Sequence, residues 1–129
     1  MHYYATQTGA DETTVKNALV KVTKKSSNVI IAVPGLDNLE NNAIRDGLGK
    51  ENATALKTKH VVSINSVQCF LMTKKITPVK SYPILAIYVS IDQISSIVNQ
   101  FPNEELYYVA WTPAERDSFC AKFPYAKEF

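Results

Sequence analysis

Residues 28–38 read NVIIAVPGLDN: an apolar run from Val29 to Val33, a Pro-Gly break, and then a polar segment that begins with Asp37. The run lacks the alternation of apolar and polar residues that a half-exposed strand shows, which predicts a strand buried on both faces. Pro34 and Gly35 end this strand, and the polar residues after them are typical of a helix start. The stretch therefore predicts an α/β fold in which a covered central strand leads into a helix.

Two later segments have the same pattern. Residues 84–89 and 106–111 are apolar on both faces, and each is followed at once by residues that favour a helix start. The second of these starts, Thr112-Pro113-Ala114-Glu115, combines a cap, a proline at the first helical position and a glutamate at the third. A further amphipathic helix is predicted before residue 28, because apolar residues recur at helical spacing from Val15 to Val22.

The segment from residue 51 to residue 82 has a weaker pattern. Apolar residues alternate with others over 67–72, which predicts a strand there. The connection over 73–82 is too short for the crossover helix that usually joins parallel neighbours. The strand at 67–72 is therefore predicted to run antiparallel to the next strand or to lie elsewhere in the sheet.

Together these elements predict a single α/β domain over residues 1–129. Its expected architecture is a three-layer α/β/α sandwich with a mixed, mostly parallel sheet of four or five strands. A length of 129 residues suits one core, and 46% hydrophobic with 20% charged residues is ordinary for a globular protein. The sequence shows no apolar run that could span a bilayer and no signal segment, so we expect a cytoplasmic protein that does not enter a membrane.

The residues that common catalytic and cofactor sites require are missing from this sequence. Its four glycines form neither a Walker loop nor a GxGxxG motif. There is no GxSxG elbow, and the two histidines and two cysteines lack metal-ligand spacing. We therefore expect no catalytic residue, no cofactor and no metal site.

Polar residues after the covered strands mark a first candidate site. If these strands run parallel, their carboxyl ends meet at one edge of the sheet, where open α/β sheets bind ligands. The helix starts at that edge add backbone N–H donors and a partial positive charge. The candidate ligand-binding residues of this crevice are Asp37, Asn38, Ser90, Asp92, Thr112 and Glu115. The alternative interpretation is that all of them only cap helices.

Lysines in the middle of the chain form a second candidate site. The candidate basic patch consists of Lys57, Lys59, Lys74, Lys75 and Lys80. Clustered lysines neutralise phosphates, but the arginines and exposed aromatic rings that nucleic-acid surfaces usually add are missing from this part of the chain. The alternative is a solvated face that protects a strand edge from aggregation.

Aromatic residues near the C-terminus form a third feature. Tyr125 and Phe129 lie in the final FPYAKEF and are candidate interface residues, because Tyr and Phe are enriched at interface centres. The tail that carries them packs either on its own domain or on a partner. Tyr107 and Trp111 are expected in the core.

Three functions stay open on these observations. The leading one is a small non-catalytic binding protein, either a homodimer or a partner-protein module of an accessory or defence-type system. The first alternative is a small-molecule or nucleotide-binding enzyme that uses the crevice at the carboxyl edge of the sheet. The second alternative is a nucleic-acid-binding protein that uses the lysines.

Overall fold

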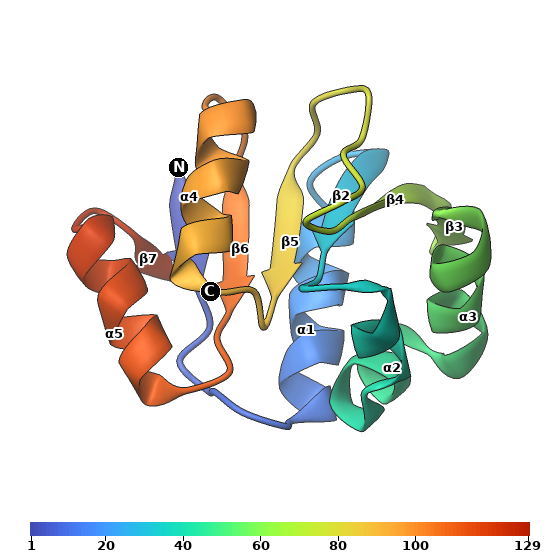
Figure 1. Cartoon of the computed structure of the whole chain (residues 1–129), viewed down its shortest axis with the longest axis horizontal. Helices are drawn as coiled ribbons and strands as arrows, with labels where there is room; N and C mark the ends of the chain where they lie inside the picture. The colour runs from blue at the N-terminus through green and yellow to red at the C-terminus, as the bar shows by residue number, and fades with distance from the viewer.

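A computed structural model describes all 129 residues and contains one seven-stranded sheet, in the order β3-β4-β2-β5-β6-β1-β7 (Figure 1). The strands are β1 His2–Tyr4, β2 Asn28–Ala32, β3 Val61–Ile64, β4 Val67–Met72, β5 Ile84–Ile87, β6 Leu106–Val109 and β7 Lys127–Glu128. The helices are α1 Glu12–Thr23, the 3₁₀ helix η1 Leu36–Glu40, α2 Asn42–Leu48, α3 Lys50–Lys59, α4 Ile91–Gln100 and α5 Pro113–Lys122.

The predicted α/β class with a mixed sheet is confirmed, but the predicted number of strands is wrong. The sheet has seven strands rather than four or five, because β1, β3 and β7 join it. β1 has three residues and β7 has two, so neither is long enough to show an alternating pattern in the sequence. Both lie toward one edge, where β1 pairs in parallel with β6 and with β7.

The strand over residues 67–72, β4, is parallel to β2, and β5 is parallel to β2 on its other side. The prediction that β4 runs antiparallel to the next strand is therefore wrong, whereas its alternative, a place elsewhere in the sheet, agrees with the structure. Residues 73–83 cross from one side of β2 to the other without a helix. The antiparallel strand that makes the sheet mixed is β3, which pairs with β4 at the edge.

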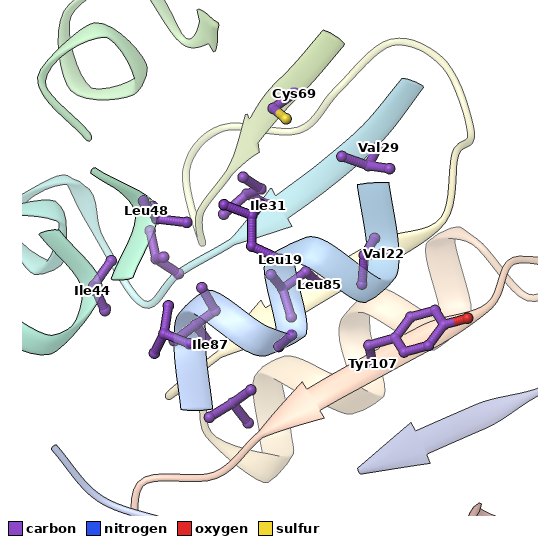
Figure 2. Packing of buried hydrophobic residues seen from close by; sticks show 14 of the residues in the cluster. Leu19, Val22, Val29, Ile31, Ile44, Leu48, Cys69, Leu85, Ile87 and Tyr107 are labelled. Atoms are coloured by element: carbon purple, nitrogen blue, oxygen red, sulfur yellow. The ribbon is translucent and has the colours of Figure 1, made fainter. Parts of the chain in front are cut away.

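Side chains along the central strands alternate between two buried clusters. Ile31 of β2 belongs to a larger cluster that includes residues of α1, α2 and α3. Ile30 of the same strand belongs to a smaller cluster that includes Ile94 and Ile97 of α4 and Phe119 of α5. Figure 2 shows the larger cluster, in which α1 side chains such as Leu19 lie over the sheet. Because β2 and β5 each contribute to both clusters, they carry apolar side chains on both sides.

Several helix starts follow the sequence pattern and one helix differs from it. Asp11 caps α1, since its carboxylate accepts a hydrogen bond from the Thr13 amide at 3.0 Å. The predicted helix start at Asp37 is instead a 3₁₀ turn, and Asn41 caps the α-helix that follows. Gly47 suits a helix end but lies inside α2. The close approach of Val15 of α1 explains the glycine, because a larger residue at this position would collide with it.

The last residues of the chain pack on the same chain. β7 adds to the sheet beside β1, and the Phe129 ring meets Tyr107 edge to face, with ring centroids 5.3 Å apart. Tyr125, in contrast, is 91% exposed. Both cysteines are free; Cys69 is buried, and burial raises the pKa of its thiol to about 11.

None of the helices combines the length and the hydrophobicity that crossing a bilayer requires.

Candidate functional site

The crevice lies at the carboxyl edge of the sheet, between the chain segments that leave β2 and β5. These two strands are parallel neighbours at the centre of the sheet. After β2 the chain enters η1 and α2, whose buried residues join the larger cluster, whereas after β5 it enters α4, whose buried residues join the smaller one. The two connections therefore diverge to opposite faces, which is the arrangement that opens a ligand crevice in open α/β sheets.

A cavity of about 290 Å³ occupies this crevice. Its volume is near the lower end of the range for small-molecule sites. Residues that follow β2, β4, β5 and β6 line it, namely Pro34, Asn38, Asn41, Lys74, Tyr88, Ser90, Gln93, Trp111 and Glu115. Two neighbouring hollows share residues with it, one beside Asp37 and Lys75 and the other along α4 beside Asp92.

Gln93 lines the crevice and carries a buried acceptor without a partner. The residue lies in the first turn of α4 and is only 6% exposed. Its Nε2 donates a hydrogen bond of 3.1 Å to the carbonyl of Val33, just after β2, and so joins the two diverging connections. This bond fixes the amide orientation, and Oε1 is left without any hydrogen-bond partner. A buried acceptor of this kind costs roughly 1–3 kcal/mol unless a donor reaches it.

Tyr88 holds a strained backbone conformation beside the cavity. It follows the last residue of β5 and has φ of 60°, a left-handed conformation that is rare for a bulky residue. Its hydroxyl donates a hydrogen bond of 2.6 Å to the carbonyl of Gly9, and burial raises the pKa of this hydroxyl. The Gly9 amide in turn donates to the carbonyl of Ala110. The segment before α1 is thus tied across the ends of β5 and β6. Strained residues held by their surroundings cluster at functional sites.

Trp111 forms the aromatic rim of the crevice. It follows β6 and meets Tyr88 edge to face, with ring centroids 4.8 Å apart and an interplanar angle of 74°. The side chain is 43% exposed, so the expectation that Trp111 lies in the core is wrong. The chain contains no other tryptophan. An indole that faces the cavity and is still partly exposed can stack on a bound ring.

Two helices begin beside the crevice with well-formed caps. The Ser90 hydroxyl accepts a hydrogen bond from the Gln93 amide at 3.1 Å, and the Thr112 hydroxyl accepts one from the Glu115 amide at the same distance. The amides of Ile91 and Asp92 donate to no acceptor within the chain. The amino end of α4 therefore offers free donors together with the positive end of the helix dipole.

The structure separates the six residues predicted for this site. Asn38, Ser90 and Glu115 line the central cavity. Asp37 and Asp92 line the two neighbouring hollows instead. Thr112 caps α5 and is not among the residues that line these hollows. Sequence reasoning missed Gln93, Tyr88 and Trp111. Tyr88 and Trp111 lie within two positions of the ends of β5 and β6, which is the signal that could have indicated them, whereas Gln93 carries no such signal.

The predicted basic patch is divided between different surfaces. Lys57 forms ion pairs with Glu40 at 2.9 Å and with Asp37 at 3.6 Å. Hydrogen bonding to Glu40 raises the pKa of Lys57 and lowers that of Glu40. Lys74 and Lys75 line the hollow next to Pro34, whereas Lys57 lines a separate hollow beside α2 and α3. Lys59 and Lys80 are exposed and line neither of these hollows.

No cluster of three or more metal-binding side chains occurs in the structure. In comparisons with known proteins, no family model, no curated protein and no solved structure matches the chain. The function of this chain is therefore to be sought in the geometry of the crevice.

Proposed function

We propose that this protein binds a small molecule in the crevice at the carboxyl edge of its sheet. The observation that carries the proposal is the buried Gln93 Oε1, an acceptor without a partner beside a cavity of about 290 Å³. The two buried clusters, each with its own helices, support a three-layer arrangement in which the connections after β2 and β5 diverge. A donor from a bound molecule would satisfy Gln93 at the point of divergence.

The strain at Tyr88 supports the same proposal. A non-glycine residue in the left-handed region costs of order 1–3 kcal/mol, and the hydroxyl bond to Gly9 helps to hold it there. Tyr88 lies five positions before Gln93, and both residues line the cavity together with Trp111.

The Gln93→Met variant separates binding from stability. The substitution removes one unpaired acceptor, Gln93 Oε1, and leaves another, the Val33 carbonyl, so the two costs largely cancel. We expect the free energy of unfolding to change by less than about 1 kcal/mol. The wild-type protein, with a ligand at about 100 times its Kd, should gain about 2.7 kcal/mol and several degrees in Tm. Gln93→Met should lose that gain.

The measurement is a thermal-shift screen of polar metabolites, read together with the fluorescence of Trp111. Gln100→Met is the matched control, because Gln100 is exposed in the last turn of the same helix and does not line the central cavity. This control should keep the full shift. The proposal fails if no metabolite moves either signal, or if the shift survives in Gln93→Met.

A second candidate function, a protein-interaction module, is favoured by Tyr125, which lies just beyond the carboxyl end of α5 and whose side chain is 91% exposed. One exposed ring is a smaller feature than the contiguous apolar patch that usually marks an interface. Phe129, its proposed companion, is partly buried against the chain's own Tyr107. For this reason the crevice ranks first.

A further inference from the structure

The order in which the crevice residues lie along the sheet edge indicates what kind of molecule they suit. Lys74 follows β4, Ser90 and Gln93 follow β5, and Trp111 follows β6. The strands lie in the order β4-β2-β5-β6, so the sheet sets a cation, an acceptor and an aromatic ring in one row. Neighbouring strands are ~4.8 Å apart, so the row from β4 to β6 spans about 14 Å.

Toward the β4 side of the row, between Lys74 and the start of α4, the site suits an anion. Lys74 is exposed and forms no ion pair within the chain. The free amides of Ile91 and Asp92 begin α4, a helix of ten residues, next to Ser90. Backbone donors at a helix start, together with the helix dipole and a lysine, favour a phosphate or carboxylate. Lys74, Ser90, Asp92 and Gln93 line one hollow, so the lysine and the start of α4 lie beside the same space.

In the middle of the row the site requires a donor. Because Gln93 Nε2 is committed to the Val33 carbonyl, Oε1 is fixed as an acceptor and selects for an O–H or N–H group on the ligand. Glu115 adds a second acceptor toward β6, although one of its oxygens already receives the Thr112 hydroxyl at 3.2 Å. A hydroxyl-bearing sugar next to an anion presents donors at this point.

At the β6 end the site suits a flat ring. The Trp111 indole is held edge to face by Tyr88, and Tyr88 is held in turn by Gly9, so the indole is positioned before any ligand arrives. Stacking on a fixed aromatic side chain tolerates many heterocycles, because each presents a π face. An anion, a donor-bearing sugar and a ring, in that order, are the parts of a nucleotide.

From this row we infer that the ligand of the crevice is a nucleoside 5′-monophosphate, with its phosphate at Lys74 and the start of α4, its ribose at Gln93 and its base on Trp111. This inference rests on the proposed function and specifies the ligand class. It also assigns separate roles to the two ends of the site, and these roles can be tested one at a time.

The test is calorimetric titration of the full chain with four nucleoside 5′-monophosphates, their parent nucleosides and ribose 5-phosphate at fixed ionic strength. At least one nucleotide should bind tenfold or more tightly than ribose 5-phosphate, since base stacking is lost in the latter. Trp111→Ala should reduce nucleotide affinity to the ribose 5-phosphate level and leave ribose 5-phosphate affinity unchanged. Lys74→Ala should weaken nucleotides and leave nucleosides unchanged.

Matched controls exist for both variants. Tyr125→Ala removes an exposed aromatic ring from the opposite end of α5, and Lys80→Ala removes a lysine from the same connection as Lys74. Neither should alter nucleotide affinity. The ligand class is overturned if no nucleotide binds, if ribose 5-phosphate binds as tightly as every nucleotide, or if Trp111→Ala leaves nucleotide affinity unchanged. A different metabolite that loses its thermal shift in Gln93→Met would keep the proposed function while overturning this inference.

Discussion

Phe119→Ala is expected to lower the free energy of unfolding by about 3–5 kcal/mol. Phe119 is fully buried and is the large side chain by which α5 enters the smaller cluster. Its ring lies 4.9 Å from the Tyr108 ring and 5.0 Å from the Phe123 ring, measured between centroids. Truncation would leave a cavity under α5 that the sheet cannot fill, and a typical domain has only about 5–15 kcal/mol of stability in total.

Denaturant unfolding of Phe119→Ala beside Tyr125→Ala measures this effect. Tyr125 lies just beyond the same helix and is 91% exposed, so its truncation should change the free energy of unfolding by less than about 0.5 kcal/mol. A cost below about 1 kcal/mol for Phe119→Ala would contradict the packing of α5 on the sheet.

Gly47→Ala is expected to destabilise the protein by about 1–3 kcal/mol, although alanine is the better helix former. A β-carbon at position 47 would lie 2.6 Å from both Cβ and Cγ1 of Val15 and 3.0 Å from the Glu12 carbonyl oxygen. Val15 is fully buried, so α1 and α2 would have to move apart. Thermal or denaturant unfolding gives the size of the effect.

A double-mutant cycle with Val15→Gly tests the cause. In that background the two closest contacts, with Cβ and Cγ1 of Val15, are absent, so Gly47→Ala should cost at least about 1 kcal/mol less than it does in the wild type. If the two substitutions were additive within about 0.5 kcal/mol, the close contact between α1 and α2 would not be the reason for the glycine.

The parts of the fold that the sequence predicts are those with a strong local pattern. NVIIAVPGLDN indicates a covered strand because β2 contributes to two buried clusters, each with its own helices, and Thr112-Pro113 indicates the start of α5 because capping needs these residue types. β1 and β7 have no such pattern, since β1 depends on pairing with β6 in the finished sheet and β7 depends on pairing with β1. The parallel direction of β4 is likewise set by β2 rather than by its own connection.

The candidate site, too, could be predicted from the sequence only in part. The sheet edge is predictable, because parallel strands must bring their carboxyl ends together. Gln93 looks like an ordinary residue of a helix start until the fold places it beside the Val33 carbonyl, sixty positions earlier in the chain. Trp111 resembles a core residue in the sequence because it continues the apolar run of a strand that is covered on both faces. Only the structure shows that β6 ends before Trp111, which leaves this side chain partly exposed.

The central claim, that the crevice binds a small molecule, is tested most directly by a ¹H–¹⁵N NMR titration with the metabolite that gives the largest thermal shift. The side-chain amide of Gln93 and the single indole N–H of Trp111 are natural probes on the cavity wall. We predict that these signals and the backbone amides of Ile91 and Asp92 shift in a saturable way, while signals from Lys59 and Tyr125 stay in place. Shifts that gather around Lys59 or Tyr125 and leave Gln93 and Trp111 unchanged would contradict the claim.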